Sequence, residues 1–372
     1  MRLPASISKL YLTTIVVLLG ALADSRLLAA SELETMDSEV TALYDKSKDA
    51  VVKVHAESTI RLGQLVLRTN PRAGTGFFID GQGHLMTSSS VVQDEETCWI
   101  EYRDQRVPAK IVGCDPDSRV ALLQVDPEKC VGAGHQTPFL PQGDPNLMRI
   151  GSMVIAIGFP YDMPSLPVVG FVGGLDIKCG AHTFITSHFR ADCKLSPGQG
   201  GGPFLNSRGE VVGIAIASHG ENQSYGLPIN AAMKVCTDII QGGKPQHGWV
   251  GLSVSERRII PGLPGLNEWQ VFIQQVYSNT PAADAGFHDQ DVLLQICTNE
   301  IHRSADVLNT MFYHHCGEKI SFTVLRKGQR QEVTLIVGTR PPAEQLVVLP
   351  TQPLPFIRED NPPPPAVPAS TK

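Results

Sequence analysis

The stretch at residues 196–203 constrains this chain more than any other part of its sequence. It reads Ser-Pro-Gly-Gln-Gly-Gly-Gly-Pro and stands between apolar runs that read as strands. Glycine adopts left-handed backbone conformations and permits close approach of other atoms without steric cost. The stretch therefore predicts a loop that holds a substrate close to its backbone.

Short β-rich runs separated by turn residues occupy most of the chain before residue 245. Such runs at regular spacing favour an all-β barrel or sandwich. Apolar residues at helical spacing predict two helices, over residues 32–48 and 231–241. The predicted strands lie at residues 51–54, 74–80, 81–87, 99–102, 107–112, 120–125, 153–157, 168–172, 184–185 and 211–217.

A short linker ends this region, and a second β-rich unit follows it. The linker reads Gly-Gly-Lys-Pro at residues 242–245. From residue 341 onward proline dominates, which is typical of a disordered or extended tail. The predicted domains therefore span 31–245 and 246–340, with a tail at 341–372. The elements predicted in the second domain are strands at 249–254, 271–276, 291–296, 319–325 and 332–337 and a helix at 304–315.

The first thirty residues read as a secretory signal peptide, at 1–30. Basic residues precede an apolar run over residues 10–22, and small residues that suit cleavage follow it. A membrane anchor is the alternative, but Asp24 and Arg26 interrupt the run short of the ~20 apolar residues that a spanning helix needs. We therefore expect a periplasmic or secreted protein with no stable membrane span after cleavage.

Charge and cysteine content limit the classes of partner. The formal net charge is −6 at pH 7 and no basic run occurs, which argues against nucleic-acid binding. The 8 cysteines suit an exported protein in an oxidising compartment, and none stands in a C-x-x-C pair. Cys179 and Cys193 could close the loop that enters the glycine-rich stretch, or the thiols could be buried and free. We expect no metal site and no cofactor.

Two parts of the sequence resemble the HtrA/Do-like family of trypsin-like serine proteases. Residues 196–214 are similar to the family's nucleophile loop, N-P-G-N-S-G-G-P-L-x-N followed by G-E-V-I-G-I. Residues 280–293 are similar to the pattern S-P-A-x-x-A-G-L…G-D-x-I of its PDZ domain. The resemblance runs over residues 51–340. It implies a mostly β fold, with a trypsin-like double six-stranded β-barrel followed by a PDZ domain.

The resemblance also locates the catalytic positions. Serine proteolysis needs a hydroxyl nucleophile, a histidine that takes its proton and a carboxylate that orients the histidine. The positions that match these roles in the family hold Gly200, Ser90 and Arg119. All three catalytic roles are vacant, which implies a pseudoprotease. The alternative is an active endopeptidase with relocated residues, and the candidate bases near the expected cleft are His84, His182 and His188.

The resemblance implies two places for peptide binding. By family analogy the amides of Gly198 and Gly200 line an oxyanion hole. The alternative is that so many glycines leave the loop conformationally flexible. PDZ domains add an extended peptide as a strand and hold its terminal carboxylate with backbone amides. The residues that match the carboxylate loop and the two pocket walls are Trp249, Val250, Gly251, Leu252, Val254, Val307, Leu308 and Met311, and the alternative for the apolar ones is simple core packing.

The sequence thus predicts an exported, proteolytically inactive HtrA-like protein. We expect it to bind unfolded or C-terminal peptides of other proteins, in a chaperone-like or regulatory role in protein quality control. The first alternative is the active endopeptidase with relocated residues. The second is a structural subunit that assembles through residues 32–48, since family members resembling this one commonly form homotrimers.

Overall fold

The computed structural model describes residues 32–62, 65–95, 97–179, 182–219, 222–258 and 269–341. The predicted signal peptide at 1–30 and the predicted tail beyond residue 341 lie outside the described residues. The chain divides into two compact units. The first runs to Gly248 and also contains Ala305–His315, and the second contains Trp249–Ser304 and the residues from Cys316 onward.

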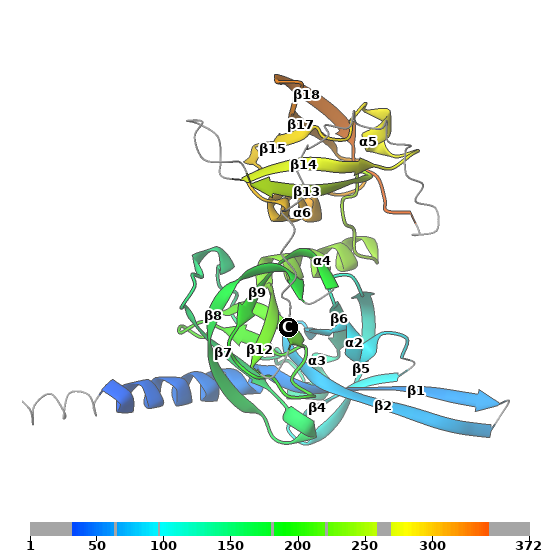
Figure 1. Ribbon diagram of the computed structural model, residues 1–372. Helices are drawn as coiled ribbons and strands as arrows, with labels where there is room; N and C mark the ends of the chain where they lie inside the picture. The colour runs from blue at the N-terminus through cyan, green and yellow to red at the C-terminus, as the bar shows by residue number, and fades with distance from the viewer. Residues whose placement is uncertain are drawn as a thin grey trace, which may run out of the picture. The chain divides into compact units, whose positions relative to one another are not determined.

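The first barrel of the first unit is closed by six antiparallel strands in the order β1-β2-β3-β6-β5-β4. Alternate residues of β1, Val52, Val54 and Ala56, are buried in its core, as the two-residue period of a strand requires. β1 and β2 continue beyond the barrel as a long hairpin (Figure 1). The strands are β1 (Val51–Leu62), β2 (Leu65–Phe78), β3 (His84–Ser88), β4 (Thr97–Tyr102), β5 (Gln105–Asp115) and β6 (Val120–Val125).

The second barrel has the same number of strands, in the order β10-β11-β12-β9-β8-β7. Phe189 and Phe204 meet edge to face in its core, with ring centroids 5.1 Å apart, a favourable geometry for aromatic pairs. The strands are β7 (Met153–Gly158), β8 (Leu166–Cys179), β9 (His182–Ala191), β10 (Pro203–Leu205), β11 (Val211–His219) and β12 (Gln223–Pro228).

Helices flank the two barrels. The predicted N-terminal helix covers residues 32–47. The helix α4 (Ile229–Gly242) buries Val235 and Ile239 in a core that both barrels share. The remaining short elements are η1 (Lys48–Ala50), α2 (Ser89–Val92), α3 (Pro127–Val131), η2 (Pro145–Leu147) and η3 (Pro160–Asp162). No helix among the described residues is long and apolar enough to cross a membrane.

The second unit is built on one antiparallel sheet. Its order is β13-β14-β15-β17-β18, so β13 forms an edge, and β16 pairs with β15. Phe287 and Phe322 pack edge to face beneath it, 5.1 Å between centroids. The elements after Gly248 are β13 (Leu252–Arg258), β14 (Trp269–Val276), α5 (Pro281–Asp284), β15 (Val292–Ile296), β16 (Asn299–Glu300), α6 (Ser304–Tyr313), β17 (Lys319–Arg326) and β18 (Gln329–Ile336).

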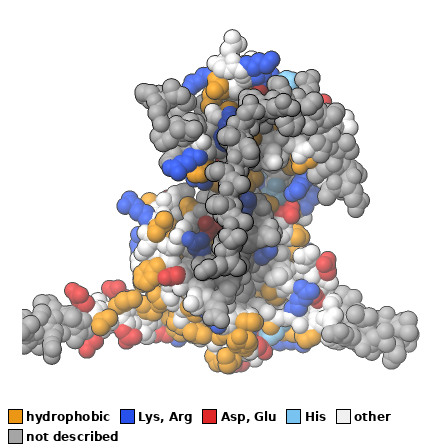
Figure 2. All heavy atoms as spheres, viewed as in Figure 1, with side chains coloured by type: hydrophobic (Ala, Val, Ile, Leu, Met, Phe, Trp, Pro, Cys, Tyr) orange, Lys and Arg blue, Asp and Glu red, His pale blue; other side chains and the backbone are white. Residues whose placement is uncertain are grey.

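The predicted fold class is confirmed: two closed six-stranded barrels precede a second β-rich unit with short helices. The expected Cys179 to Cys193 pairing is not formed, because Cys193 is buried and free. Acidic and basic side chains are interspersed over the described part of the face shown in Figure 2, with no broad basic area there.

Candidate functional site

The glycine-rich loop at residues 196–203 connects β9 to β10 and is held by one buried threonine. The Thr75 hydroxyl donates to the Gly198 carbonyl at 2.8 Å and accepts from the Phe159 amide at 3.0 Å. The Thr75 amide donates to the Gly200 carbonyl at 3.0 Å. At the far end of the loop, the Gly201 amide donates to the Ala215 carbonyl at 2.7 Å. These hydrogen bonds give the loop a defined path across β2 and β11.

The glycines of this loop differ in whether the backbone conformation and the space around them require glycine. Gly198 has φ of 95°, and a Cβ there would collide with the Phe159 carbonyl. Gly201 has φ of 86°, and a Cβ there would collide with the Thr75 carbonyl. Gly200 has no positive φ, and a Cβ built on it meets no atom within 4 Å. Position 200 therefore offers room for a side chain, whereas positions 198 and 201 require glycine.

Ser90 lies on the short helix α2, at the edge of the first barrel. Its side chain is 2.9 Å from the Ser88 hydroxyl, and its carbonyl accepts from Arg72 Nη1 at 2.7 Å. Arg72 also pairs with Glu95, with 2.9 Å between Nε and Oε1. A hydroxyl therefore occupies the position predicted for the catalytic base, and a serine hydroxyl does not serve as a general base near neutral pH.

Arg119 lies in the turn between β5 and β6, with φ of 62°. Its carbonyl accepts from the Ser89 amide at 3.0 Å, so its backbone adjoins α2. No ion pair of its guanidinium occurs among the described residues. The backbone thus brings positions 90 and 119 to neighbouring segments, and the residue at the position predicted for the catalytic carboxylate, Arg119, is a cation.

The same turn begins at Asp115, a buried carboxylate that the sequence analysis did not single out. Asp115 is 2% exposed and accepts from His247 Nε2 at 2.7 Å and from the Ser118 amide at 3.3 Å. Burial disfavours its ionised form, but the hydrogen bonds and the His247 charge outweigh this and lower the pKa of Asp115. Asp115 and His247 are 132 positions apart in sequence, so no local pattern links them.

Two of the candidate replacement bases are engaged elsewhere. His84 Nδ1 is 2.7 Å from Asp80 Oδ2 at the start of β3. His188 is 1% exposed and stacks on Phe184, with 3.9 Å between ring centroids. The side chain of His182 lies outside the described residues. The contacts of His84 with Asp80 and of His188 with the Thr186 carbonyl do not join either histidine to a serine.

The loop offers backbone donors instead. The amides of Gly198 and Gly200 donate none of the hydrogen bonds described for residues 32–341 outside the gaps. Two free amides on one tight turn can bind a carbonyl oxygen or an anion. The loop therefore presents backbone donors at Gly198 and Gly200, with no side chain at position 200.

The residues predicted to hold a peptide terminus in the second unit lie on and before β13. Gly251 has φ of 86°, and a Cβ there would collide with the Thr280 side chain. The amides of Val250 and Gly251 donate no hydrogen bond among the described residues. The Trp249 amide is taken by the Gly338 carbonyl, at 3.2 Å. The stretch 249–251 thus presents two free donors beside an edge strand.

The apolar residues proposed for the pocket walls fall into different units. Leu252 and Val254 lie two apart on β13 and are half-buried. Val307 and Met311 are one helical turn apart on α6, with 4% and 7% exposed, and Leu308 lies between them. Because α6 groups with the first unit, the joining of the two walls stays a prediction.

Comparison with known proteins supports this description. A family model described as trypsin-like peptidase domain matches residues 74–214, and one described as PDZ domain matches residues 248–337. The chain is 31% identical over 276 residues to a probable periplasmic serine endoprotease, DegP-like, of Pseudomonas putida. That match covers 72% of this chain and 56% of the relative, so the chain spans little more than half of its length. A similar protein of Hahella chejuensis is 27% identical over the same number of residues, 276.

Solved structures show the same fold. The HtrA-type protease AlgW, solved with a tripeptide, superposes with a TM-score of 0.68 at 24% identity, over 82% of this chain and 99% of that one. A serine endoprotease from Yersinia pestis superposes with a TM-score of 0.57. The trypsin-like domain and the PDZ domain that the sequence predicted are thus both present.

Proposed function

We propose that this HtrA-like chain, a trypsin-like domain followed by a PDZ domain, is a proteolytically inactive protein that binds peptides. The observation that carries the proposal is the set of residues at the predicted catalytic positions, Ser90, Arg119 and Gly200. The glycine-rich loop beside them is still held by its hydrogen bonds to Thr75 and Ala215. Each replacement removes a different catalytic role, and the loop retains its free amides.

The size of the catalytic loss supports inactivity. Removing all three residues of a protease triad costs about 10⁶ in kcat, and the oxyanion hole and binding leave about 10³ to 10⁴ over water. A chain without nucleophile, base or orienting carboxylate therefore turns over peptides too slowly for a protease. The donors at Gly198 and Gly200 still stabilise a bound carbonyl oxygen.

The peptide ligand is proposed from the second unit. An exposed edge strand pairs with an extended peptide through main-chain hydrogen bonds, and free amides before it suit a terminal carboxylate. β13 and the amides of Val250 and Gly251 supply both features. We infer that the ligands are unfolded or C-terminal peptides of other proteins, in a chaperone-like or regulatory role. The AlgW structures with bound peptides support this proposal by analogy.

The test of the proposal combines hydrolysis and binding on the full chain. Unfolded casein incubated with the protein is expected to remain intact, and peptides with a free C-terminus are expected to bind more tightly than the same peptides amidated. Cleavage abolished by a serine-directed inhibitor would overturn the inactive assignment. Equal binding of free and amidated peptides would overturn the carboxylate site. Substitution at Gly251 is a poor control, because the Thr280 contact would disturb the fold.

Export and assembly complete the proposal. The predicted signal peptide at 1–30 and the periplasmic relatives support a periplasmic or secreted location. The residues 32–39 of the N-terminal helix are all exposed, including Leu33 at 70% and Met36 at 41%. This apolar exposure favours a homotrimer or other oligomer joined through that helix. Light scattering of the chain and of a Leu33→Ser/Met36→Ser variant tests it: an unchanged mass would contradict the helix as the contact.

A further inference from the structure

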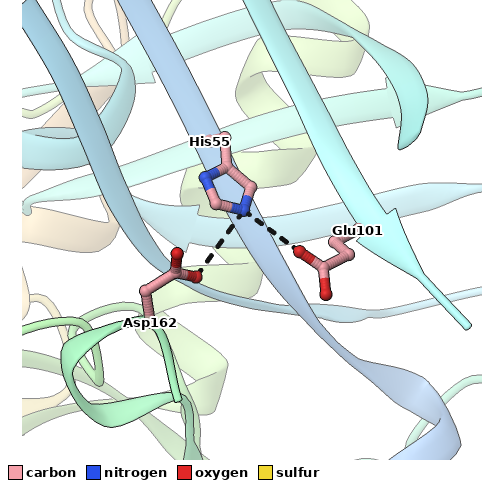
Figure 3. A group of neighbouring side chains, drawn as sticks. All are labelled: His55, Glu101 and Asp162. Atoms are coloured by element: carbon pink, nitrogen blue, oxygen red, sulfur yellow. Dashed lines mark ion pairs between the residues drawn. The ribbon is translucent and has the colours of Figure 1, made fainter. Parts of the chain in front are cut away.

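We propose that His55, Glu101 and Asp162 form a binding site for one Zn²⁺ ion in the first unit. The three side chains come from three elements: His55 from β1, Glu101 from β4 and Asp162 from the end of η3. Figure 3 shows both carboxylates turned toward the imidazole. The site lies apart from positions 90, 119 and 200 in sequence and does not depend on the proposed peptide binding.

Strand pairing fixes two of the three ligands. β1 and β4 are antiparallel, with Lys53 opposite Glu101 and His55 opposite Trp99. The His55 ring stacks on the Trp99 ring, with 5.4 Å between centroids and 8° between planes. The imidazole is 17% exposed and its orientation is held by this contact. A ligand whose ring is already oriented loses little rotamer freedom when a metal binds.

The distances suit a small divalent ion. His55 Nε2 is 3.7 Å from Glu101 Oε2 and 3.9 Å from Asp162 Oδ1. Donor atoms bound tetrahedrally to zinc at about 2.0–2.2 Å stand about 3.4 Å from one another. Glu101 Oε2 therefore needs to approach the imidazole nitrogen by about 0.3 Å, and Asp162 Oδ1 by about 0.5 Å. The three donor atoms all lie within 4.8 Å of one another.

The donor set selects the metal. An imidazole nitrogen with two carboxylate oxygens suits zinc, whereas calcium and magnesium take oxygen donors in larger number. Three protein ligands leave a fourth tetrahedral position, which water fills.

A lysine competes with the ion for the same carboxylates. Lys53 Nζ lies 3.1 Å from Asp162 Oδ1 and 3.4 Å from Glu101 Oε1, and it donates to the Asp162 carbonyl at 2.9 Å. Its charge offsets one of the two carboxylate charges when no ion is bound. Zinc displaces this ammonium group, because two cations cannot share Asp162 Oδ1. Lys53 therefore lowers the zinc affinity and is the residue whose removal tightens it.

Binding at this site ties together both barrels of the first unit. β1 and β4 belong to the first barrel, and η3 follows β7 of the second. Next to Asp162, the Tyr161 amide donates to the Pro197 carbonyl of the glycine-rich loop at 2.7 Å. An ion that binds only the folded chain raises its melting temperature. Zinc is thus expected to stabilise the first unit.

The experiment is isothermal titration of the chelator-treated full chain with ZnCl₂, alongside a thermal melt at each zinc concentration. We expect one site and a rise in melting temperature. His55→Phe keeps a ring on Trp99 but removes the donor, and Asp162→Asn suits the positive φ of that position while weakening the ligand. Both are expected to reduce the zinc affinity by at least about 10-fold, because even a change in a residue that only orients a metal ligand can cause such a loss. Lys53→Met is expected to raise it by about 10-fold.

His84→Ala is the matched control. His84 also contacts a carboxylate, that of Asp80, but no third metal ligand among the described residues joins this pair. This variant is expected to bind zinc as the unaltered chain does. Zinc binding of equal strength in the unaltered chain and His55→Phe would place the ion elsewhere, at the free thiols for example, and overturn the proposal. A dissociation constant above about 1 mM in both the unaltered chain and Lys53→Met, which is a weak affinity, would also overturn the proposal.

Discussion

At the scale of single residues, the glycine-rich loop separates positions that its backbone requires from one that it does not. Gly201 combines a positive φ with a carbonyl in the path of any Cβ. Gly200 has neither restriction. The geometry of the loop therefore does not require glycine at position 200.

This difference predicts opposite effects of alanine at the two positions. Gly200→Ala is expected to be neutral or to stabilise the chain by up to about 1 kcal/mol, because alanine restricts the unfolded chain. Gly201→Ala is expected to destabilise it by at least about 2 kcal/mol, through left-handed strain and the collision with Thr75. Calorimetric melting of both variants checks this, and equal losses would show that the loop also needs glycine at 200.

The three positions predicted for the triad can be tested by substitution. The triple variant Ser90→His/Arg119→Asp/Gly200→Ser is expected to cleave unfolded casein in a manner blocked by a serine-directed inhibitor. Gly200→Ser alone is expected to stay inactive, because triad residues act as a unit. Aspartate tolerates the φ of 62° at position 119. A folded but inert triple variant would mean that the positions are not aligned for catalysis.

The buried Asp115 predicts a pH dependence. Its pKa is lowered in the folded chain, so its contribution to stability is complete above about 3.9, the ordinary value, and is lost as the pH falls through the lower folded value. Asp115→Asn is expected to melt at a lower temperature than the unaltered chain at pH 7, and the gap is expected to narrow toward pH 3. The exposed Asp117→Asn is the control. A gap independent of pH would contradict the role of the charge.

Single residues also mark the limit of what the sequence revealed about the site. The motif predicts the three catalytic positions and Gly198, since these lie in continuous stretches, and their roles stay predictions. The contribution of Thr75 was not foreseen, although it stands between two glycines in a predicted strand. The pairs formed by His247 with Asp115 and by His55 with Asp162 join distant segments, which periodicity and spacing do not connect.

At the scale of elements, Thr75 is the point where three segments meet. Its hydroxyl links β2 to the glycine-rich loop and to the residue that follows β7. Thr75→Val keeps the shape but leaves the Gly198 carbonyl and the Phe159 amide without this partner. We expect a loss of about 2–4 kcal/mol, since each unsatisfied buried group costs about 1–3 kcal/mol.

Thr75→Ser is the control for this prediction. It retains the hydroxyl and is expected to lose less than half as much stability. Urea unfolding monitored by circular dichroism measures both variants. Similar losses in the two would show that the methyl group, and not the hydrogen bonds, is responsible.

Elements whose apolar residues recur with a clear strand or helix period were predicted from the sequence, and others were not. β4, β6, β7 and α4 lie where apolar runs predicted them. β10 has three residues and β12 contains Gly226, so neither carries a strand signal of its own. The length of the β1 and β2 hairpin was also missed, because residues 57–71 mix apolar and charged residues without the strict alternation that predicts a strand.

At the scale of the whole molecule, burial predicts which thiols react. Burial raises the pKa of Cys98 and of Cys236 to about 12, and these thiols resist ionisation. Cys316 is exposed. Alkylation of the native chain near pH 8 is expected to modify Cys316 first and to leave Cys98 and Cys236 unmodified until urea is added. Mass spectrometry of the labelled peptides checks this, and rapid labelling of Cys236 would contradict its burial.

The open space at position 200 has a consequence for how the chain can change over generations. A glycine codon that ends in U or C becomes a serine codon by one nucleotide change, and a Cβ at position 200 meets no atom within 4 Å. On the proposed function, such a serine is expected to bring no hydrolysis while positions 90 and 119 remain as they are. Selection for hydrolysis would then favour only the three changes together. The loop has room for serine at position 200, but that serine alone is not expected to give hydrolysis. On the proposed function, glycine at position 200 therefore tends to persist.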